Sequence, residues 1–160
     1  MFQMAAQLID SNMKLTTTKL DFDQIVQKQL QDIDNLFFQR LIELCDERIA
    51  IQRAKVSPEG YNDQTGQLRS SVGYIIYRDG KVLHENFELA PYGTDKAPGL
   101  KAGRDLALSQ LRITQGWGVV MVAGMEYASW LESNYNRTVL SSATFKLEDD
   151  IEYILKNISV

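Results

Sequence analysis

The stretch SVGYIIYRDGKVLHENFEL, residues 71–89, decides the fold. Its first run, residues 71–77, is rich in β-branched and aromatic residues on both faces, and a second run follows at residues 82–89. Asp79 and Gly80 stand between the two runs. Because a type I′ turn needs positive φ at both of its central positions, Asp-Gly at this place predicts an antiparallel hairpin.

Helical patterns lie on both sides of the hairpin. Upstream, apolar residues recur at steps of three and four, which predicts one long helix over residues 21–54 with Asp21 or Asp23 as its N-cap. Downstream, similar spacing predicts a short helix over residues 100–111 and a last helix over residues 140–158. The last helix carries the cleanest apolar stripe in the chain.

Residues 117–122, WGVVMV, predict a third strand. Its nearly continuous apolar character is typical of a strand that is covered on both faces, so we expect it at the centre of the sheet. A further short helix is expected over residues 125–133. The chain is therefore predicted to be an α+β protein, in which a mostly antiparallel sheet is packed by the long N-terminal helix and a C-terminal helix. Residues 1–20 are interpreted as an N-terminal arm or extension and residues 21–160 as a single domain.

The composition of the 160 residues excludes several classes of site. The single cysteine, Cys45, excludes disulfide frameworks and thiolate zinc clusters, and we expect it to be buried as a small apolar side chain. The single histidine, His84, argues against zinc hydrolases, whose sites need several imidazoles. A formal net charge of -4 argues against a surface that grips nucleic-acid phosphates. We therefore expect no metal, no cofactor and no catalytic residues.

The sequence also bears on location. No apolar run approaches the roughly 20 residues that a membrane span needs. The N-terminus lacks the basic segment that precedes the apolar stretch of a secretory signal. We therefore expect a cytosolic chain, or a component of an assembly that is made in a cytosol, with no membrane contact.

Two patterns with a chemical interpretation are weak. Gly99 and Gly103 precede a helix in the manner of a phosphate-binding turn, but the Gly-Lys-Ser/Thr ending of such a turn is missing. Asp149, Asp150 and Glu152 could serve acid–base chemistry, yet a solvated helical face carries such residues by default. Neither pattern predicts a site.

Three segments keep a distinctive order along the chain. TGQLRSS, residues 65–71, leads directly into the first strand, MEYASWLES follows the third strand, and the terminal helix comes last. Gly66 frees the chain to turn, Leu68 can anchor the loop, and Arg69 is suited to a carboxylate or to the carbonyl groups of a neighbour. Plain packing, with Arg69 and Glu132 solvated, explains the spacing equally well.

With these motifs the chain resembles the tail-completion and head–tail joining proteins of long-tailed phages, the tail terminator-like minor tail component family. The likeness covers roughly residues 21–158. The residues that carry it are Thr65, Gly66, Leu68, Arg69 and Ser71, then Tyr127, Ala128 and Glu132. The Gly-Thr that usually follows this glutamate is replaced here by Ser133-Asn134-Tyr135.

The resemblance implies a non-enzymatic ring subunit, commonly hexameric, that caps the tail tube and joins the tail to the head at the neck of the virion. Its implied partners are further copies of itself, the tail tube protein and neck or connector proteins. DNA would pass through the lumen without specific binding. Two long loops, residues 61–69 and 89–101, are natural places for contacts with neighbours. The candidate assembly-interface residues are Tyr61, Arg69, Tyr92, Lys101, Glu132 and Tyr135.

Three other functions fit the sequence. The chain could belong to a head-side connector or adaptor ring. It could be a monomeric adaptor that binds extended peptides by strand addition at an exposed sheet edge. It could also be a small hydrolase built around His84 and a serine.

Overall fold

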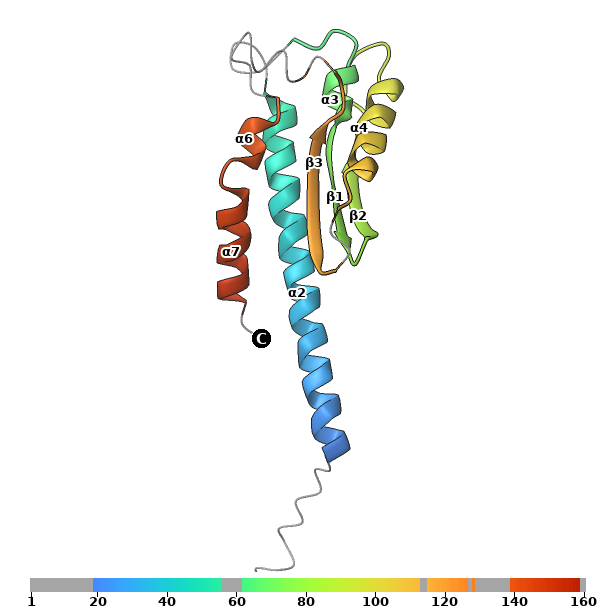
Figure 1. Ribbon diagram of the computed structural model, residues 1–160. Coiled ribbons are helices and arrows are strands. Elements are labelled where there is room, and N and C mark those ends of the chain that lie inside the picture. The colour runs from blue at the N-terminus through green and yellow to red at the C-terminus, as the bar shows by residue number, and fades with distance from the viewer. Residues whose placement is uncertain (1–18, 56–61, 113–114, 127, 129–138, 159–160) are drawn as a thin grey trace, which may run out of the picture. The chain divides into compact units, whose positions relative to one another are not determined.

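The computed structural model describes residues 19–55, 62–112, 115–126, 128 and 139–158 (Figure 1). The chain forms two compact units, one of Met1–Phe38 with Ile158–Val160 and one of Gln39–Asn157. The helices and strands are α2 (Lys19–Ala54), α3 (Gln67–Ser71), β1 (Val72–Arg78), β2 (Lys81–Phe87), α4 (Ala97–Ser109), β3 (Trp117–Ala123), α6 (Ser141–Thr144) and α7 (Leu147–Asn157). The predicted α+β class is therefore confirmed.

The long helix α2 begins at Lys19 and ends at Ala54, where the sequence predicted its end. Because it starts before residue 21, Asp21 lies in the first turn and is not the N-cap. A carboxylate in that turn still stabilises the helix through the positive end of its dipole. None of the described helices is long and apolar enough to span a membrane.

The sheet is antiparallel with the strand order β2-β1-β3. The predicted hairpin is confirmed, since Asp79 and Gly80 join β1 to β2 with φ of 51° and 76°. Ile76 pairs with His84 and Tyr77 with Val82, so β2 bulges by one residue between these two pairs.

β1, and not β3, is the central strand, which corrects the prediction for residues 117–122. Six of the seven residues of β1 are buried, whereas most of β3 is half-buried. β1 is covered on both faces because Tyr74 faces α2 on one side and Ile75 and Tyr77 pack with Ala107 of α4 on the other. The apolar run in β3 therefore belongs to a strand that pairs with only one other strand among the described residues, and most of its side chains are partly exposed.

Two glycines let α4 lie directly against the backbone before β1. A Cβ at Gly99 would overlap the carbonyl of Gln67, and a Cβ at Gly103 would overlap that of Ser71. Close helix packing therefore explains the two glycines of the weak phosphate-turn pattern.

The 65–71 motif leads directly into β1, which confirms the prediction, but most of the motif is itself helical. Residues Gln67–Ser71 form the one-turn helix α3, and β1 begins only at Val72. The Asp63 carboxylate stabilises this short helix, because it accepts hydrogen bonds from the backbone N–H groups of Gly66 and Arg69, at 2.9 and 2.7 Å. The expected loop over residues 61–69 is thus partly helical.

The predicted single last helix is two helices, α6 and α7. Lys146 lies between them with a φ of 58°, a left-handed conformation that ends α6. The guanidinium of Arg48 donates a hydrogen bond to the carbonyl of Phe145 at this break, at 3.2 Å, and forms an ion pair with Asp150 of α7. The spacing of apolar residues continues through the break, which is why the stripe alone indicated one helix.

Two further predictions concern the burial of Cys45 and a short helix over residues 125–133. Cys45 is fully buried on α2, as expected, and burial raises the pKa of its thiol to about 12. The helix expected over residues 125–133 lies mostly outside the described residues, which include only positions 125, 126 and 128 of it.

Candidate functional site

A cleft of about 610 Å³ lies where the last turns of α2 face the end of β2 and the segment after it. All of its lining belongs to the unit Gln39–Asn157. The lining residues are Asp46, Ala50, Arg53, Ala54, Arg69, Asn86, Glu88, Leu89, Ala90, Pro91 and Tyr92.

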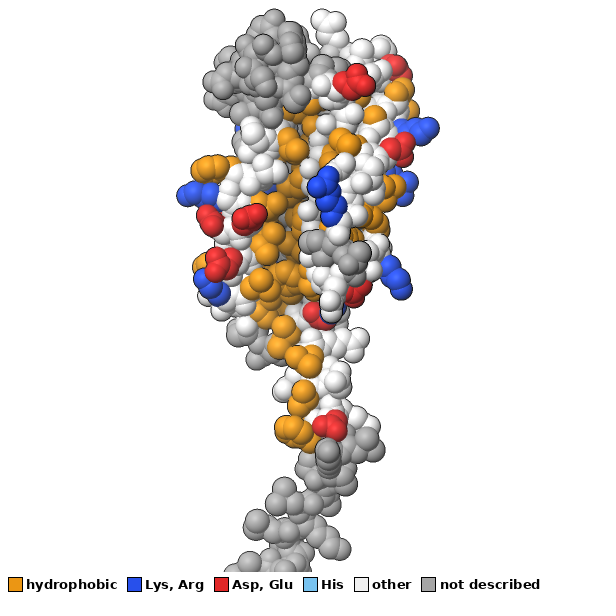
Figure 2. Space-filling model, in the orientation of Figure 1, with side chains coloured by type: hydrophobic (Ala, Val, Ile, Leu, Met, Phe, Trp, Pro, Cys, Tyr) orange, Lys and Arg blue, Asp and Glu red, His pale blue; other side chains and the backbone are white. Residues whose placement is uncertain are grey.

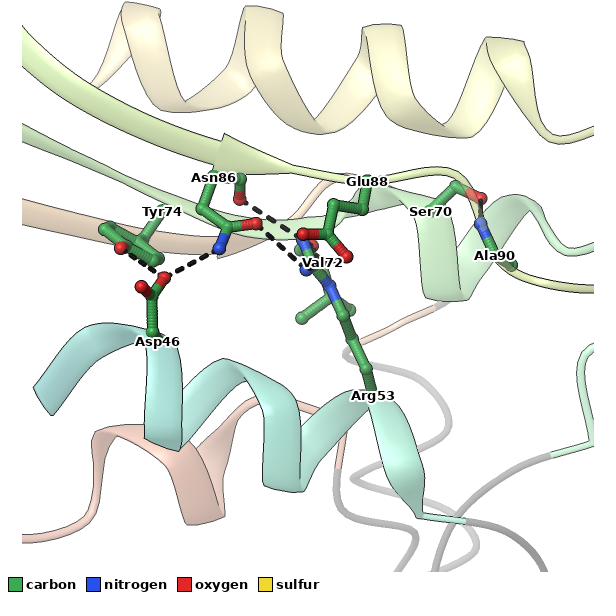
Figure 3. Close-up of polar contacts among 8 residues, drawn as sticks. All are labelled: Asp46, Arg53, Ser70, Val72, Tyr74, Asn86, Glu88 and Ala90. Atoms are coloured by element: carbon green, nitrogen blue, oxygen red, sulfur yellow. Dashed lines mark hydrogen bonds and ion pairs between the residues drawn. The ribbon is translucent and has the colours of Figure 1, made fainter. Parts of the chain in front are cut away.

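Arg53, in the last turn of α2, is the central cation of this cleft (Figure 3). Its Nη2 and Nε donate hydrogen bonds to the carbonyl of Val72, at 2.8 and 3.2 Å. Nη1 donates to Oδ1 of Asn86 at 3.0 Å, and Nη2 also donates to the Asn86 carbonyl at 3.2 Å. Glu88 lies 3.4 Å from the same guanidinium. One side chain therefore joins the end of α2 to both β1 and β2.

Asp46, further back along α2, makes a second link to the sheet (Figure 3). Its Oδ1 accepts hydrogen bonds from the hydroxyl of Tyr74 at 2.6 Å and from Nδ2 of Asn86 at 2.7 Å. Burial, then the hydrogen bond to Asp46, raise the pKa of Tyr74 well above its ordinary value. The Tyr74 hydroxyl is thus held as a neutral donor.

The 65–71 motif forms a junction between α3 and the segment that follows β2. Gly66 has a φ of 78°, and a Cβ there would press on the Tyr92 carbonyl. The Ser70 hydroxyl donates to the Gly66 carbonyl at 2.6 Å. It also accepts from the backbone N–H of Ala90 at 2.8 Å (Figure 3). Leu68 is buried. The motif residues therefore have structural roles within this chain.

Arg69 is 3% exposed, so its guanidinium belongs to the interior. Its Nη2 donates to the Lys55 carbonyl at 2.8 Å, and its guanidinium carbon lies 5.5 Å from the centre of the Tyr92 ring. The carbonyl group that Arg69 was expected to find is thus in its own chain. The alternative in which Arg69 is solvated is wrong.

The structure brings two of the predicted interface residues together. Arg69 and Tyr92 both line the cleft, and Tyr92 is 44% exposed. Lys101 is exposed on another element, α4. Tyr61, Glu132 and Tyr135 lie outside the described residues.

The sequence analysis missed Asp46, Arg53, Asp63 and Asn86. Asp63 carries a local signal, because an aspartate side chain often accepts hydrogen bonds from backbone N–H groups of the turn that follows it, here that of Gly66 three residues later. Asp46 and Arg53 had no such signal. A helical face predicts which residues point inward, but it does not show which strand carbonyl or hydroxyl they will meet.

The hydrogen bonds of the cleft hold α2 against β1 and β2, and we call the group Asp46, Arg53, Tyr74 and Asn86 the bracket. The polar groups of Asp46, Arg53 and Asn86 bond to one another, to the side chains of Tyr74 and Glu88, and to strand backbone. In the described part of the chain, no group of three or more His, Cys, Asp or Glu residues could hold a metal ion. His84 is half-buried on β2 with its ring centre 5.8 Å from that of Tyr74.

Comparison of the chain with protein-family models, with curated protein sequences and with solved structures finds no match.

Proposed function

We propose that this protein is a structural subunit of a ring at the neck or tail of a tailed phage, where it caps the tail tube and joins the tail to the head. The proposal starts from the resemblance of the ordered motifs in the sequence. One structural observation carries it further: the chain leaves many large apolar side chains uncovered. Large exposed apolar surfaces in soluble proteins usually mark interaction sites.

The exposed apolar residues of the unit Gln39–Asn157 lie on α2, β2, α4 and α7 and in the segments between elements. α7 buries none of its side chains, and its Tyr153 and Leu155 are 68% and 56% exposed. Phe145, before α7, is 65% exposed. Figure 2 shows hydrophobic side chains along α2 between α7 and β3, beside the open edge of the sheet. These surfaces support a role in assembly.

The unit that contains the start of α2 has its own exposed apolar residues. Phe22, Ile25 and Leu30 are 61%, 50% and 54% exposed, and Ile33 is 39% exposed. Their spacing of three to five residues keeps them close to one side of the helix. A helix with such a side is expected to pack against a partner.

The proposal includes the partners and location that the resemblance implies. The ring would be built of copies of this chain, as a hexamer in the commonest case, and would contact the tail tube protein and neck or connector proteins. The protein would be part of the virion and would carry out no chemistry. The net charge of -4 suits a wall that lets DNA pass without binding its phosphates. A head-side connector ring is the nearest variant of this role.

Native mass spectrometry of the purified chain over a range of concentrations, with negative-stain electron microscopy, tests the proposal. We expect a closed oligomer of defined size, formed alone or on addition of the tail tube protein of the source phage. A protein that stays strictly monomeric under both conditions would contradict it.

A monomeric adaptor that binds extended peptides is the second candidate. The observation that favours it is the open edge of β3, whose apolar side chains are only half-buried. Such an adaptor would bind extended peptides in fluorescence anisotropy while remaining a monomer by light scattering.

A further inference from the structure

We propose that α7 is exchanged between copies of this chain. In the exchange, α6 and α7 straighten into one continuous helix, and α7 of each copy then lies on α2 of a neighbour. The proposal rests on the proposed ring function, since it names the element that links adjacent subunits. The segment that moves is Leu147–Asn157, and the hinge is formed by Phe145 and Lys146. The surface that receives it is made of Leu44, Glu47, Arg48 and Ile51 of α2.

α7 lies loosely on α2 of its own chain. No residue of α7 is buried, and Ile51 on the α2 side is 53% exposed. A groove of about 290 Å³ is lined by side chains of both helices. The ion pair between Arg48 and Asp150, with the hydrogen bond that Arg48 donates to the Phe145 carbonyl, holds α7 in this position. Departure of α7 therefore exposes little apolar surface that was buried before.

The apolar stripe of α6 and α7 is that of one continuous helix. Six apolar residues recur at steps of three and four across the break, namely Leu140, Ala143, Leu147, Ile151, Ile154 and Ile158. At 3.6 residues per turn they fall within an arc of about 80° on a single helix. Residues 141–158 contain neither glycine nor proline, the usual signals for the end of a helix. The sequence therefore favours a continuous helix, which the observed arrangement does not contain.

The break itself is strained. Lys146 has a φ of 58°, and Phe145 before it is extended, with a ψ of 124°. The left-handed conformation of Lys146 is unfavourable for a residue with a Cβ. In a continuous helix both residues are right-handed, and the first N–H groups of α7 gain carbonyl partners in the preceding turn. Straightening therefore removes strain and adds backbone hydrogen bonds.

Straightening must carry α7 away from α2 of its own chain. α6 is anchored, because Ala143 is 3% exposed and Val139 just before α6 is fully buried. Between α6 and α7 the chain leaves the helical path in a short loop (Figure 1). Rotation of the Phe145 ψ from 124° to the helical range gives α7 a new direction relative to α6. Asp150 then leaves Arg48 of the same chain, and the groove on α2 is open.

The occupant of the open groove is α7 of a second copy. The groove presents apolar side chains beside the Arg48 cation, and a released α7 presents its apolar stripe beside the Asp150 carboxylate. These two surfaces already meet within one chain, so exchange restores the same ion pair and the same apolar contact between copies. Exchange of an identical element is a low-cost route to oligomers, and a strained hinge favours it. When each α7 passes to the next copy, the contact is heterologous and closes into a ring if the rotation allows it.

Reversal of one charge at a time tests the exchange. One full-length variant carries Arg48→Asp and the other carries Asp150→Arg. In either variant alone, like charges meet at this contact whether α7 stays in its own chain or passes to an identical copy. In an equimolar mixture, opposite charges meet again only when α7 passes between the two different chains. Native mass spectrometry with one variant isotopically labelled counts the mixed oligomers, and light scattering gives the dissociation constant of assembly.

We expect the mixture to assemble with a dissociation constant on the order of tenfold or more below that of either variant alone, with the two variants in equal numbers. The control mixture combines Arg40→Glu with Glu43→Arg. Because Arg40 and Glu43 pair within one helix at 2.9 Å, exchange of α7 cannot restore this pair, and mixing should bring no gain. Absence of a gain for the Arg48 and Asp150 variants as well would overturn the proposal.

The hinge gives a second test that does not alter the groove. Lys146→Gly and Lys146→Thr are a matched pair, since each removes the same charge and the same contact with the Phe145 ring. Glycine tolerates the left-handed conformation and weakens a continuous helix, whereas a β-branched residue disfavours positive φ. We expect the dissociation constant of assembly to be on the order of tenfold higher for Lys146→Gly than for Lys146→Thr. Equal assembly of the two variants would overturn the hinge, and with it the exchange.

Failure of the exchange can be told apart from failure of the proposed function. If the unmodified chain forms closed rings, but mixing brings no gain and the two hinge variants assemble alike, the exchange is wrong and the ring function stands. If mixing brings the expected gain but yields only reciprocal dimers, the exchange stands and the ring function fails. A chain that stays monomeric in every experiment would overturn both.

Discussion

At the scale of single residues, Arg53 is the side chain on which most of the bracket depends. Its side chain is 14% exposed, and its guanidinium donates to the Val72 carbonyl and to two oxygens of Asn86. A planar guanidinium with several N–H groups can serve both strands at once, which an ammonium group cannot. Loss of this group leaves partly buried acceptors without their donors.

We expect Arg53→Ala to lower the free energy of unfolding by about 3 kcal/mol, because hydrogen bonds to a partly buried charged group are lost and their acceptors stay desolvated. Urea denaturation followed by circular dichroism measures this change. Arg40→Ala is the matched control, since the Arg40–Glu43 pair is more than half exposed and should contribute less than about 1 kcal/mol. Equal effects of the two variants would show that the bracket is not stabilising.

Cys45 makes stability depend on pH in the alkaline range. Burial, with a smaller effect of Asp46, raises the pKa of its thiol from 9.0 to about 12. The folded chain therefore keeps the proton at pH values where the unfolded chain releases it. This contribution is complete below about pH 9 and is lost as the pH rises to about 12. Tyr74, whose pKa is also raised, acts in the same direction.

We expect Cys45→Ala to make the unfolding free energy less sensitive to alkali between about pH 9 and pH 12. The slope should differ from that of the unmodified chain by up to about 1.4 kcal/mol per pH unit, which corresponds to one proton. Urea titrations at a series of pH values measure the two slopes. Parallel slopes would mean that the thiol does not couple to folding in this way.

The candidate site could be predicted only in part from its residues. The sequence pointed to Arg69 and Tyr92, which do lie together in the cleft. It did not point to Asp46 or Arg53, because their roles depend on a hydroxyl and a carbonyl from strands that follow much later in the chain. Local patterns carry no information about such distant partners.

At the scale of elements, the break between α6 and α7 depends on one strained residue. Lys146 adopts a φ of 58°, which costs a residue with a Cβ roughly 1 kcal/mol relative to glycine. We expect Lys146→Gly to raise the thermal midpoint, with a gain in unfolding free energy of about 0.5–1 kcal/mol. Differential scanning calorimetry measures the midpoint.

Lys156→Gly is the control for this prediction. Lys156 lies in the last turn of α7 and pairs with Glu152, so glycine there should destabilise by about 1 kcal/mol. A loss of stability in both variants would contradict the proposed cause of the break.

Strands and helices were predictable where the signal is local. The Asp79-Gly80 turn and the end of α2 near Ala54 needed only neighbouring residues. The choice of the central strand needed more, because β1 and β3 are both apolar and only the helices packed on the sheet distinguish them. Likewise, a continuous apolar stripe concealed the break at Lys146.

At the scale of the whole molecule, exposed and buried apolar residues should respond differently to truncation. Leu41 is 1% exposed, whereas Phe22 and Leu30 are 61% and 54% exposed. We expect Leu41→Ala to destabilise the folded chain by about 3 kcal/mol, because it removes buried methyl groups and leaves a cavity.

The joint change of Phe22→Ala and Leu30→Ala should alter the unfolding free energy of the monomer by less than about 1 kcal/mol and should weaken self-association. Denaturation at low protein concentration and sedimentation velocity at high concentration measure the two effects. A loss of monomer stability as large as that of Leu41→Ala would mean that these side chains belong to the fold and are not an assembly surface.

The pairing of β1 with β3 also sets the order in which the chain can fold. Ile75 pairs with Glu85 in the hairpin, but its partner on the other side, Val120, is 45 residues further along the chain. During synthesis the hairpin of β1 and β2 can form early. The other edge of β1 stays unpaired until the residues of β3 have been synthesised. Contacts that span such long loops slow folding and prolong the exposure of strand edges. The yield of native protein should therefore depend on how fast β3 reaches β1.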